Sequence, residues 1–254
     1  GVCYFGLEAA AIAAKKNKMV TIIEMADRVM NRTVDPQISE YYLNLHKSYG
    51  VKFHFNTSLE TINKISDSLK VICSDGTEVK ADSILIGAGV VPNIELAEEA
   101  GIYCDNGIIV DEFGQTNFKK IYACGDCTNH PNKILNKNLR LESVHNAMEQ
   151  AKTVASSVMN NPMEYNQVPW FWSDQYDHKL QIVGLSGDHD MVTMRGDTND
   201  AKFMLFYTKD EELIAVDAIN NPKEFLISRK LVANKVKIKP EVICDPNTNL
   251  NDLI

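Results

Sequence analysis

Residues 116–126 read Thr-Asn-Phe-Lys-Lys-Ile-Tyr-Ala-Cys-Gly-Asp, so a short apolar run ends in a glycine and a carboxylate. The run at 121–123 predicts a buried strand, and open α/β sheets bind ligands at the carboxyl ends of such strands. Gly125 has no Cβ, so a ligand can approach the backbone there, and Asp126 can accept hydrogen bonds from sugar-alcohol hydroxyls. A Gly-Asp pair is also common in plain turns. The stretch therefore indicates an α/β fold, with either a ligand site or a turn at Asp126.

The composition is that of a globular chain of about two domains. Its 254 residues are 44% apolar and 24% charged, and the formal net charge is −8. This acidic balance argues against general binding to nucleic acid or to anionic membranes. No apolar run approaches the roughly 18 residues of a membrane span, and six scattered cysteines are too few for a disulfide scaffold. We therefore expect a cytoplasmic protein with no nucleic-acid or membrane partner.

The first 24 residues have the pattern of a dinucleotide-binding unit. Residues 1–6 hold two of the three glycines of G-x-G-x-x-G, with Cys3 at the middle position. A helical pattern follows, then a strand at 19–23 that ends at Glu24, about 18 residues after the last glycine, near the spacing of a ribose-binding acid. A carboxylate there binds the ribose 2′-hydroxyl and repels a 2′-phosphate, which favours NADH over NADPH. Another strand–helix unit with an acidic turn would look similar.

The strand that should precede Gly1 is missing from the sequence. In a Rossmann half that strand lies at the centre of the sheet, and its neighbours need it as a pairing partner. We therefore expect this chain to be a piece of a larger protein, with an upstream segment or chain supplying the rest of the sheet and of the domain that follows it.

Residues 36–100 predict a helix followed by β-structure. The helix is expected at 36–49, where Gly50 ends it. Four strands are expected at 51–55, 59–65, 69–73 and 78–80, with a hairpin turn at Asp75-Gly76. A further buried strand is expected at 83–86, with a glycine-rich exit, before a short helix at 94–100.

Residues 140–147, Arg-Leu-Glu-Ser-Val-His-Asn-Ala, predict the start of a helix capped by Ser143. The helix N-terminus carries a partial positive charge and can stabilise an anion. The apolar residues expected to form its buried face are Val144, Ala147, Met148, Ala151, Val154, Ala155 and Val158. Cys124 and Cys127 form a C-x-x-C pair, which can be a redox dithiol or half of a zinc site. No second pair at metal-ligand spacing accompanies it, so no metal site is predicted.

Residues 165–254 predict a third, β-rich module. It opens with Pro-Trp-Phe-Trp-Ser-Asp-Gln at 169–175. Strands are expected at 180–185, 191–195, 203–207 and 213–218, and a helix at 222–231. The acid-free segment 225–239 carries Arg229, Lys230, Lys235, Lys237 and Lys239. Such a run is either a solvated face or a docking surface for an acidic partner.

In combination these motifs resemble the FAD-dependent pyridine nucleotide-disulfide oxidoreductases, and among them the NADH:ferredoxin reductases of the putidaredoxin reductase type. The resemblance covers nearly the whole chain. It implies an α/β protein with a Rossmann-like NAD(H)-binding domain at 1–90 that lacks its first strand. The C-terminal part of an FAD-binding domain would follow at 91–164, and a reductase C-terminal α+β domain at 165–254.

The resemblance also implies the cofactor contacts. Asp126, after Gly125, would hold the FAD ribitol, with Val144 and His145 near the isoalloxazine ring and Trp172 beside it. The residues implied on the NADH side are Gly1, Phe5, Gly6, Glu8, Glu24, Arg32, Gly87 and Gly89. Among them, Glu8 would reach the nicotinamide carboxamide and Arg32 the adenosine or pyrophosphate end.

The implied activity is electron transfer from NADH through FAD to a ferredoxin-like iron–sulfur protein, an NAD(P)H:ferredoxin oxidoreductase reaction. The flavin carries that chemistry, so no catalytic side chain is predicted. Two alternatives stay open. One is a redox protein like apoptosis-inducing factor, which binds FAD and NADH but turns over slowly. The other is an inactive fragment that lacks FAD.

Overall fold

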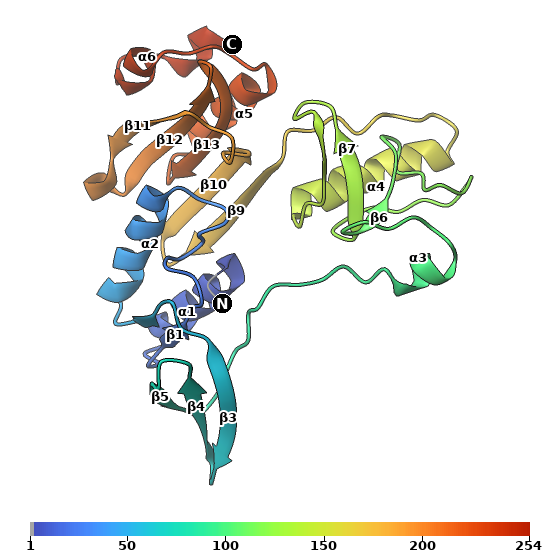
Figure 1. Cartoon of the computed structure of the whole chain (residues 1–254). Helices are drawn as coiled ribbons and strands as arrows, with labels where there is room; N and C mark the ends of the chain where they lie inside the picture. The colour runs from blue at the N-terminus through green and yellow to red at the C-terminus, as the bar shows by residue number, and fades with distance from the viewer. Residues whose placement is uncertain (1–2) are drawn as a thin grey trace. The chain divides into compact units, whose positions relative to one another are not determined.

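The computed structural model describes residues 3–254, which divide into two compact units (Figure 1). The first unit runs to Gly89 and also contains Ser173–Leu180, while the second contains Val90–Trp172 and Gln181–Ile254. The predicted cofactor residue Gly1 lies outside the described residues. Within the described part of the chain, no helix is both long enough and apolar enough to cross a bilayer.

The first unit is built around one helix-connected pair of parallel strands. Its elements in order are α1 (Tyr4–Lys15), β1 (Thr21–Ile23), α2 (Pro36–Ser48), β2 (Lys52–His54), β3 (Leu59–Ile65), β4 (Ser68–Cys73) and β5 (Glu78–Ala81). β1 and β2 pair in parallel, with Thr21 opposite Lys52, and α2 lies between them in the sequence. Parallel strands joined through a helix are the repeating unit of dinucleotide-binding sheets.

The sequence explains why α2 begins and ends where it does. The Asp35 side chain caps the helix by accepting a hydrogen bond from the Gln37 backbone N–H at 2.9 Å, and Pro36 occupies the first helical position. Ile38 and Tyr42, one turn apart, are both 0% exposed. Gly50 then adopts a φ of 81°, the left-handed conformation typical of a residue just past a helix. The predicted helix at 36–49 is therefore confirmed.

β3, β4 and β5 form a separate three-stranded antiparallel sheet. The β4–β5 turn contains Gly76 at a φ of 81°, and the Thr77 backbone N–H donates to the Asp75 carboxylate at 2.9 Å. This is the hairpin expected from the Asp-Gly pair. β3 is exposed along its whole length, so this sheet is a surface feature of the first unit.

Two predicted buried strands are not formed. Segment 83–86 has no strand, and Leu85 and Ile86 are 71% and 67% exposed. Segment 121–123 makes only an isolated bridge between Tyr122 and Gln115, and Ile121 is 42% exposed. An apolar run becomes a buried strand only where a neighbouring backbone accepts its hydrogen bonds. The β1–β2 sheet has two strands, and among the described residues it extends no ladder to segment 83–86.

The second unit begins with a small sheet and a long helix. Its elements up to residue 158 are α3 (Glu95–Glu99), β6 (Ile108–Ile109), β7 (Thr128–Asn132), β8 (Lys137–Leu139) and α4 (Val144–Val158). β7 pairs in parallel with β6 and antiparallel with β8, and α4 lies behind β7 in Figure 1. β7 was not predicted, because the segment after Asp126 reads as a series of turn residues.

The predicted apolar face of α4 is wrong. The buried residues of α4 are Asn146, Gln150 and Thr153, whereas Val144 and Met148 are 58% and 56% exposed. The polar residues face inward because the loops they cover present unpaired backbone groups. The Asn146 amide donates to the Leu141 carbonyl at 3.1 Å, for example.

An antiparallel sheet covered by helices makes up the C-terminal part of the chain. The strands are β9 (Trp170–Gln175), β10 (His178–Gly184), β11 (Met191–Asp197), β12 (Lys202–Lys209) and β13 (Glu212–Ile219), in the spatial order β11-β12-β13-β10-β9. Residues Ser173–Leu180 of β9 and β10 belong to the first unit, and the rest of these strands to the second. Helix α5 (Pro222–Ala233) packs on β13, and α6 (Pro240–Cys244) on β11. Met204, Phe206, Val216, Phe225 and Leu231 form the centre of the core, each 0–1% exposed. The predicted strands and helix of this module are confirmed.

Candidate functional site

The second unit brings Gly125 against the start of α4. Gly125 has a φ of 89°, and a Cβ built on it would lie 3.9 Å from the Ala147 Cβ. Its backbone N–H donates to the Gln150 side-chain carbonyl at 2.6 Å. The Thr128 hydroxyl lies 2.8 Å from both the Gln150 Oε1 and the Gly125 carbonyl oxygen. One buried amide on α4 therefore holds the turn that presents Asp126.

Asp126 lies near the N-cap of α4. Asp126 is exposed as a residue, but the backbone of Ser143 is close enough to influence the pKa of its carboxyl. Desolvation, and secondarily the Glu142 carboxylate, raises the pKa of Asp126, while the Ser143 N–H and the Arg140 charge act to lower it. Ser143 also caps α4 as predicted, accepting from the Asn146 backbone N–H at 3.1 Å. Asp126 and the first turn of α4 thus form one local cluster.

Arg140 stabilises this cluster, although it was not among the predicted site residues. Its guanidinium donates to the Asn106 side chain at 3.1 Å, to the Asp126 backbone carbonyl at 3.3 Å and to the Glu142 carboxylate at 2.6 Å. A single planar group therefore ties three loops together. Its position at the head of the 140–147 motif was the available sequence signal.

His145 and Trp172 meet through Trp170, a residue that was not predicted. The His145 and Trp170 rings are 5.4 Å apart at 46°, and Trp170 and Trp172 are 5.5 Å apart at 30°. Desolvation, and after it the Arg229 charge, lowers the pKa of His145, and among residues 3–254 its Nδ1 atom is buried without a hydrogen-bond partner. Trp172 is 38% exposed. The His145 imidazole and an accessible indole thus flank one half-buried tryptophan.

Arg229 does not behave as a free surface charge of the predicted basic run. Its Cζ atom lies 4.6 Å from the centroid of the Trp170 ring, a cation–π distance. Desolvation lowers the pKa of Arg229 from its ordinary value. Lys235 is exposed and lies 3.6 Å from Glu212, while Lys230, Lys237 and Lys239 are exposed on the surface of this unit.

Cys124 and Cys127 are both free thiols. The Cys127 sulfur lies 3.7 Å from the Cys124 carbonyl oxygen, and burial raises the pKa of the Cys124 thiol. A raised pKa lowers the thiolate fraction, which is the reactive form. In the described part of the chain, no group of three or more metal-ligating side chains is present.

In the first unit, Glu24 follows β1 directly, as predicted. Its backbone N–H donates to the His54 carbonyl at 2.9 Å and its carbonyl accepts from Thr57 at 3.0 Å, so β2 and its exit hold the residue. The Glu24 carboxylate accepts from the Ala26 backbone N–H at 2.8 Å. The acid is therefore oriented at the carboxyl end of the first parallel strand, where dinucleotide folds bind the ribose.

The predicted residues of the N-terminal motif lie on α1. The helix begins at Tyr4, so Gly6 and Glu8 belong to its first and second turns rather than preceding it. Phe5 is 79% exposed. Glu8 accepts a hydrogen bond from the Ser173 hydroxyl at 2.6 Å. Ser173 was not singled out as a site residue, although it lies in the quoted segment 169–175.

Arg32 and the two later glycines are exposed or half-buried. Arg32 is exposed, and Gly89 lies in a segment without strand or helix, at a φ of 89°. Gly87 lies in the same segment. The arginine that organises the loop is Arg28, whose guanidinium donates to the Val34 carbonyl at 2.9 Å and to the Ser39 hydroxyl at 2.6 Å.

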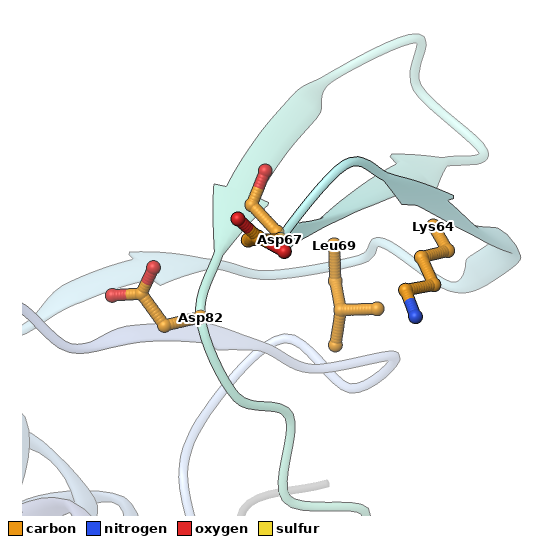
Figure 2. Close-up of a pocket in the computed structure, with 5 residues that line it drawn as sticks. Lys64, Asp67, Leu69 and Asp82 are labelled. Carbon is orange, nitrogen blue, oxygen red and sulfur yellow. The ribbon is translucent and has the colours of Figure 1, made fainter.

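A surface hollow of about 300 Å³ in the first unit holds none of the predicted residues (Figure 2). It is lined by Lys64, Asp67, Ser68, Leu69 and Asp82. Lys64 and Asp67 come from the β3–β4 hairpin, and Asp82 from the segment after β5. The hollow lies on the three-stranded sheet of β3, β4 and β5, away from the predicted cofactor residues in the sequence, so we assign no cofactor to it.

Comparison with known proteins finds reductases that match nearly the whole chain. The family model for pyridine nucleotide-disulphide oxidoreductases matches residues 1–151, and the model for the reductase C-terminal domain matches residues 170–254. Putidaredoxin reductase CamA of Pseudomonas putida is 37% identical over 99% of this chain and 60% of its own length. Rhodocoxin reductase of Rhodococcus erythropolis is 38% identical over 98% of this chain and 59% of its own length.

Solved structures of ferredoxin reductases are similar to the chain as well. The ferredoxin reductase for the CYP199A2 system of Rhodopseudomonas palustris matches with a TM-score of 0.95 and 36% identity, over 99% of this chain and 63% of that one. Putidaredoxin reductase in its covalent complex with putidaredoxin matches with a TM-score of 0.95 and 36% identity, over 100% of this chain and 61% of that one. The chain spans about three fifths of the length of these relatives. With its fold, its Gly125-Asp126 cluster and its C-terminal module, the chain belongs to the pyridine nucleotide-disulphide oxidoreductase family.

Proposed function

We propose that the protein containing this chain transfers electrons from NADH through FAD to a ferredoxin-type iron–sulfur protein. The observation that carries the proposal is the cluster of Gly125, Asp126 and the start of α4. A carboxylate lies beside a capped helix N-terminus, next to a glycine that has no Cβ to keep a ligand away from the backbone. Relatives that are 36% and 37% identical to the chain are named as ferredoxin reductases.

The residues of this cluster fit an FAD. The Asp126 carboxylate can accept hydrogen bonds from the ribitol hydroxyls. Val144, at the first position of α4, is 58% exposed, which leaves room for a flat apolar ring. The partial positive charge of the helix N-terminus stabilises negative charge on such a ring when it is reduced. FAD, when bound, supplies hydride acceptance from NADH and one-electron donation to the partner.

The remaining assignments are part of the same proposal. Residues 1–90 bind NAD(H), residues 91–164 complete the FAD domain, and residues 165–254 form the reductase C-terminal domain. Glu24 binds the adenosine ribose, and Glu8 the nicotinamide carboxamide. The NADH molecule also contacts Gly1, Phe5, Gly6, Arg32, Gly87 and Gly89. The flavin is flanked by His145 and Trp172. The cytoplasmic location also remains a proposal.

For the ferredoxin partner, the exposed lysines of the second unit offer a positively charged surface. Lys230, Lys237 and Lys239 are exposed on an otherwise acidic protein. Ferredoxin-type proteins that are acidic would be steered toward such a surface. One solved relative is a covalent complex of a reductase with putidaredoxin, which supports a partner of this kind.

An alternative is that these 254 residues alone hold no FAD. The exposed apolar residues of α4, Val144, Met148 and Val158, favour it, because a bare apolar stripe on a helix is normally covered in the intact protein. The two readings share the same fold but differ in what the isolated chain binds. A third reading, a slowly turning redox protein like apoptosis-inducing factor, keeps both cofactors and differs in rate.

The test is an absorbance spectrum of the complete protein that contains this chain. The proposal predicts a flavin band that NADH bleaches within seconds and a ferredoxin re-oxidises. Bleaching without acceptor reduction would favour the slow redox protein. Asp126→Asn is expected to lower flavin occupancy, whereas Asp105→Asn, an exposed residue outside the cluster, is the matched control. Absence of flavin from the complete protein would overturn the proposal.

A further inference from the structure

A continuous chain of hydrogen bonds connects Glu8 to the interior of the first unit. The Ser173 hydroxyl donates to the Glu8 carboxylate at 2.6 Å. The Gln175 side-chain NH₂ donates to the Ser173 oxygen at 3.1 Å, and the Gln175 carbonyl lies 2.9 Å from His46 Nε2. His46 Nδ1 lies 3.1 Å from the Tyr176 hydroxyl. Ser173, Gln175 and His46 are 0–1% exposed.

The direction of each bond follows from the donors that the side chains possess. Gln175 uses its NH₂ group toward Ser173, so its carbonyl oxygen accepts and His46 Nε2 must carry the proton. The His46 Nδ1 atom is then an acceptor and the Tyr176 hydroxyl donates to it. Burial lowers the pKa of His46, which agrees with this neutral tautomer. The Ser173 oxygen is occupied as an acceptor, so its own proton is left for Glu8.

The strand geometry explains why Ser173 reaches Glu8. Along β9 the side chains alternate between the two faces of the strand, and Ser173 and Gln175 are the buried pair. Trp172, which precedes Ser173, and Asp174, which lies between Ser173 and Gln175, are exposed. One strand therefore contributes a buried hydroxyl and a buried amide to the same face, and the amide keeps the hydroxyl in one rotamer.

We propose that Ser173 is a positioning residue that holds the Glu8 carboxylate in the orientation that binds the nicotinamide carboxamide of NADH; this rests on the proposed function. With one carboxylate oxygen held by the hydroxyl, the other oxygen stays available to accept from the carboxamide NH₂. A glutamate side chain loses rotamer freedom when it binds a ligand, and a preformed hydrogen bond removes part of that cost beforehand. The network behind Ser173 makes the orientation independent of the ligand.

The inference is tested by comparing two ligands on this chain. NADH carries the nicotinamide, whereas ADP-ribose has only the adenosine, pyrophosphate and second ribose. Calorimetric titration of Ser173→Ala is expected to show about tenfold weaker NADH binding, equivalent to about 1.4 kcal/mol, with ADP-ribose binding unchanged. Ser173→Thr, which keeps the hydroxyl, is expected to bind NADH within about threefold of the original protein, by the same conversion of energy to affinity. Asp174→Ala, on the exposed side of β9, is the matched control.

The outcomes separate the inference from the proposed function. If Ser173→Ala weakens NADH and ADP-ribose equally, Ser173 has only a structural role and the inference is wrong. It is also wrong if Ser173→Ala weakens NADH further in a Glu8→Ala background, because the two effects must then be independent. If the original chain binds ADP-ribose but Ser173→Ala leaves NADH affinity unchanged, the inference fails and the NADH assignment stands. If the complete protein that contains this chain binds neither ligand, the NADH assignment fails as well.

Discussion

Replacing Gln150 by methionine tests whether the turn at Gly125 depends on one buried amide. Gln150 is 4% exposed, and its Oε1 atom accepts from the Gly125 N–H at 2.6 Å. Methionine has nearly the same length but only a weak acceptor. The Thr128 hydroxyl keeps the Gly125 carbonyl as a partner at 2.8 Å. The variant thus leaves one buried N–H without a good acceptor.

An unsatisfied buried donor costs about 1–3 kcal/mol, and a replaced hydrogen bond to a hydroxyl adds little. We therefore expect Gln150→Met to lower the unfolding free energy of the second unit by about 2 kcal/mol. Urea denaturation followed by tryptophan fluorescence measures it, because Trp170 and Trp172 both lie in the second unit. In the complete protein the same variant is expected to lose flavin on gel filtration, since the turn presents Asp126.

The matched control is Met148→Gln on the same helix. Met148 is 56% exposed, so this change is expected to alter stability by less than about 0.5 kcal/mol. The reasoning is refuted if Gln150→Met unfolds at the same urea concentration as the original protein with the same slope. It is also refuted if the control loses as much stability as the test variant, because the effect would then not depend on the buried amide.

Four further outcomes are expected. Burial lowers the pKa of His130 to about 4, below its value near 6.5 in the unfolded chain. Above pH 6.5 the ring is neutral in both states and the protein has its full stability. As the pH falls from 6.5 to about 4, only the unfolded chain takes up the proton, and the unfolding free energy drops by about 3 kcal/mol. Urea midpoints of His130→Leu that show the same pH dependence as the original protein would contradict this. Arg195 is 8% exposed and donates to the backbone carbonyls of three residues in the C-terminal tail. Arg195→Met is therefore expected to destabilise the protein by about 3 kcal/mol. Equal thermal stability of the variant and the original protein would exclude that anchoring role. Glu24→Gln is expected to narrow the preference for NADH over NADPH at least about tenfold, since a carboxylate repels the 2′-phosphate; an unchanged ratio of the two dissociation constants would remove Glu24 from the ribose site. The double variant Lys230→Glu/Lys237→Glu is expected to slow ferredoxin reduction at low salt and to flatten its salt dependence; identical rates at all salt concentrations would place docking elsewhere.

Local pattern alone predicted the elements whose signals lie within a few residues. Asp35-Pro36 at the start and Gly50 after the end bound helix α2, and Asp75-Gly76 forms the turn it is expected to form. Strands β10, β12 and β13 read correctly because each carries its own apolar core residues. Ser143 caps α4 as expected, since a cap needs only the next turn of the same helix.

The cofactor motifs were also readable from the sequence, because each combines a residue type with a fixed spacing. Glu24 follows a real strand, and its carboxylate is oriented by the chain two residues later. Asp126 and Ser143 were predicted separately, and the backbone of Ser143 acts to lower the pKa of the Asp126 carboxyl. The motifs did not identify the residues that contact the predicted ones, namely Gln150, Arg140 and Trp170.

Tertiary structure alone decided which surfaces face inward. The apolar residues of α4 suggested one buried face, yet Asn146, Gln150 and Thr153 are the buried ones. A helix can turn either face toward its neighbours, and the choice follows from the backbone groups that await partners there. Segment 83–86 shows the same dependence, since its apolar residues form no strand without a neighbouring edge. The Ser173–Glu8 contact joins positions 165 residues apart, and no local pattern specifies a bond between residues that only the fold brings together.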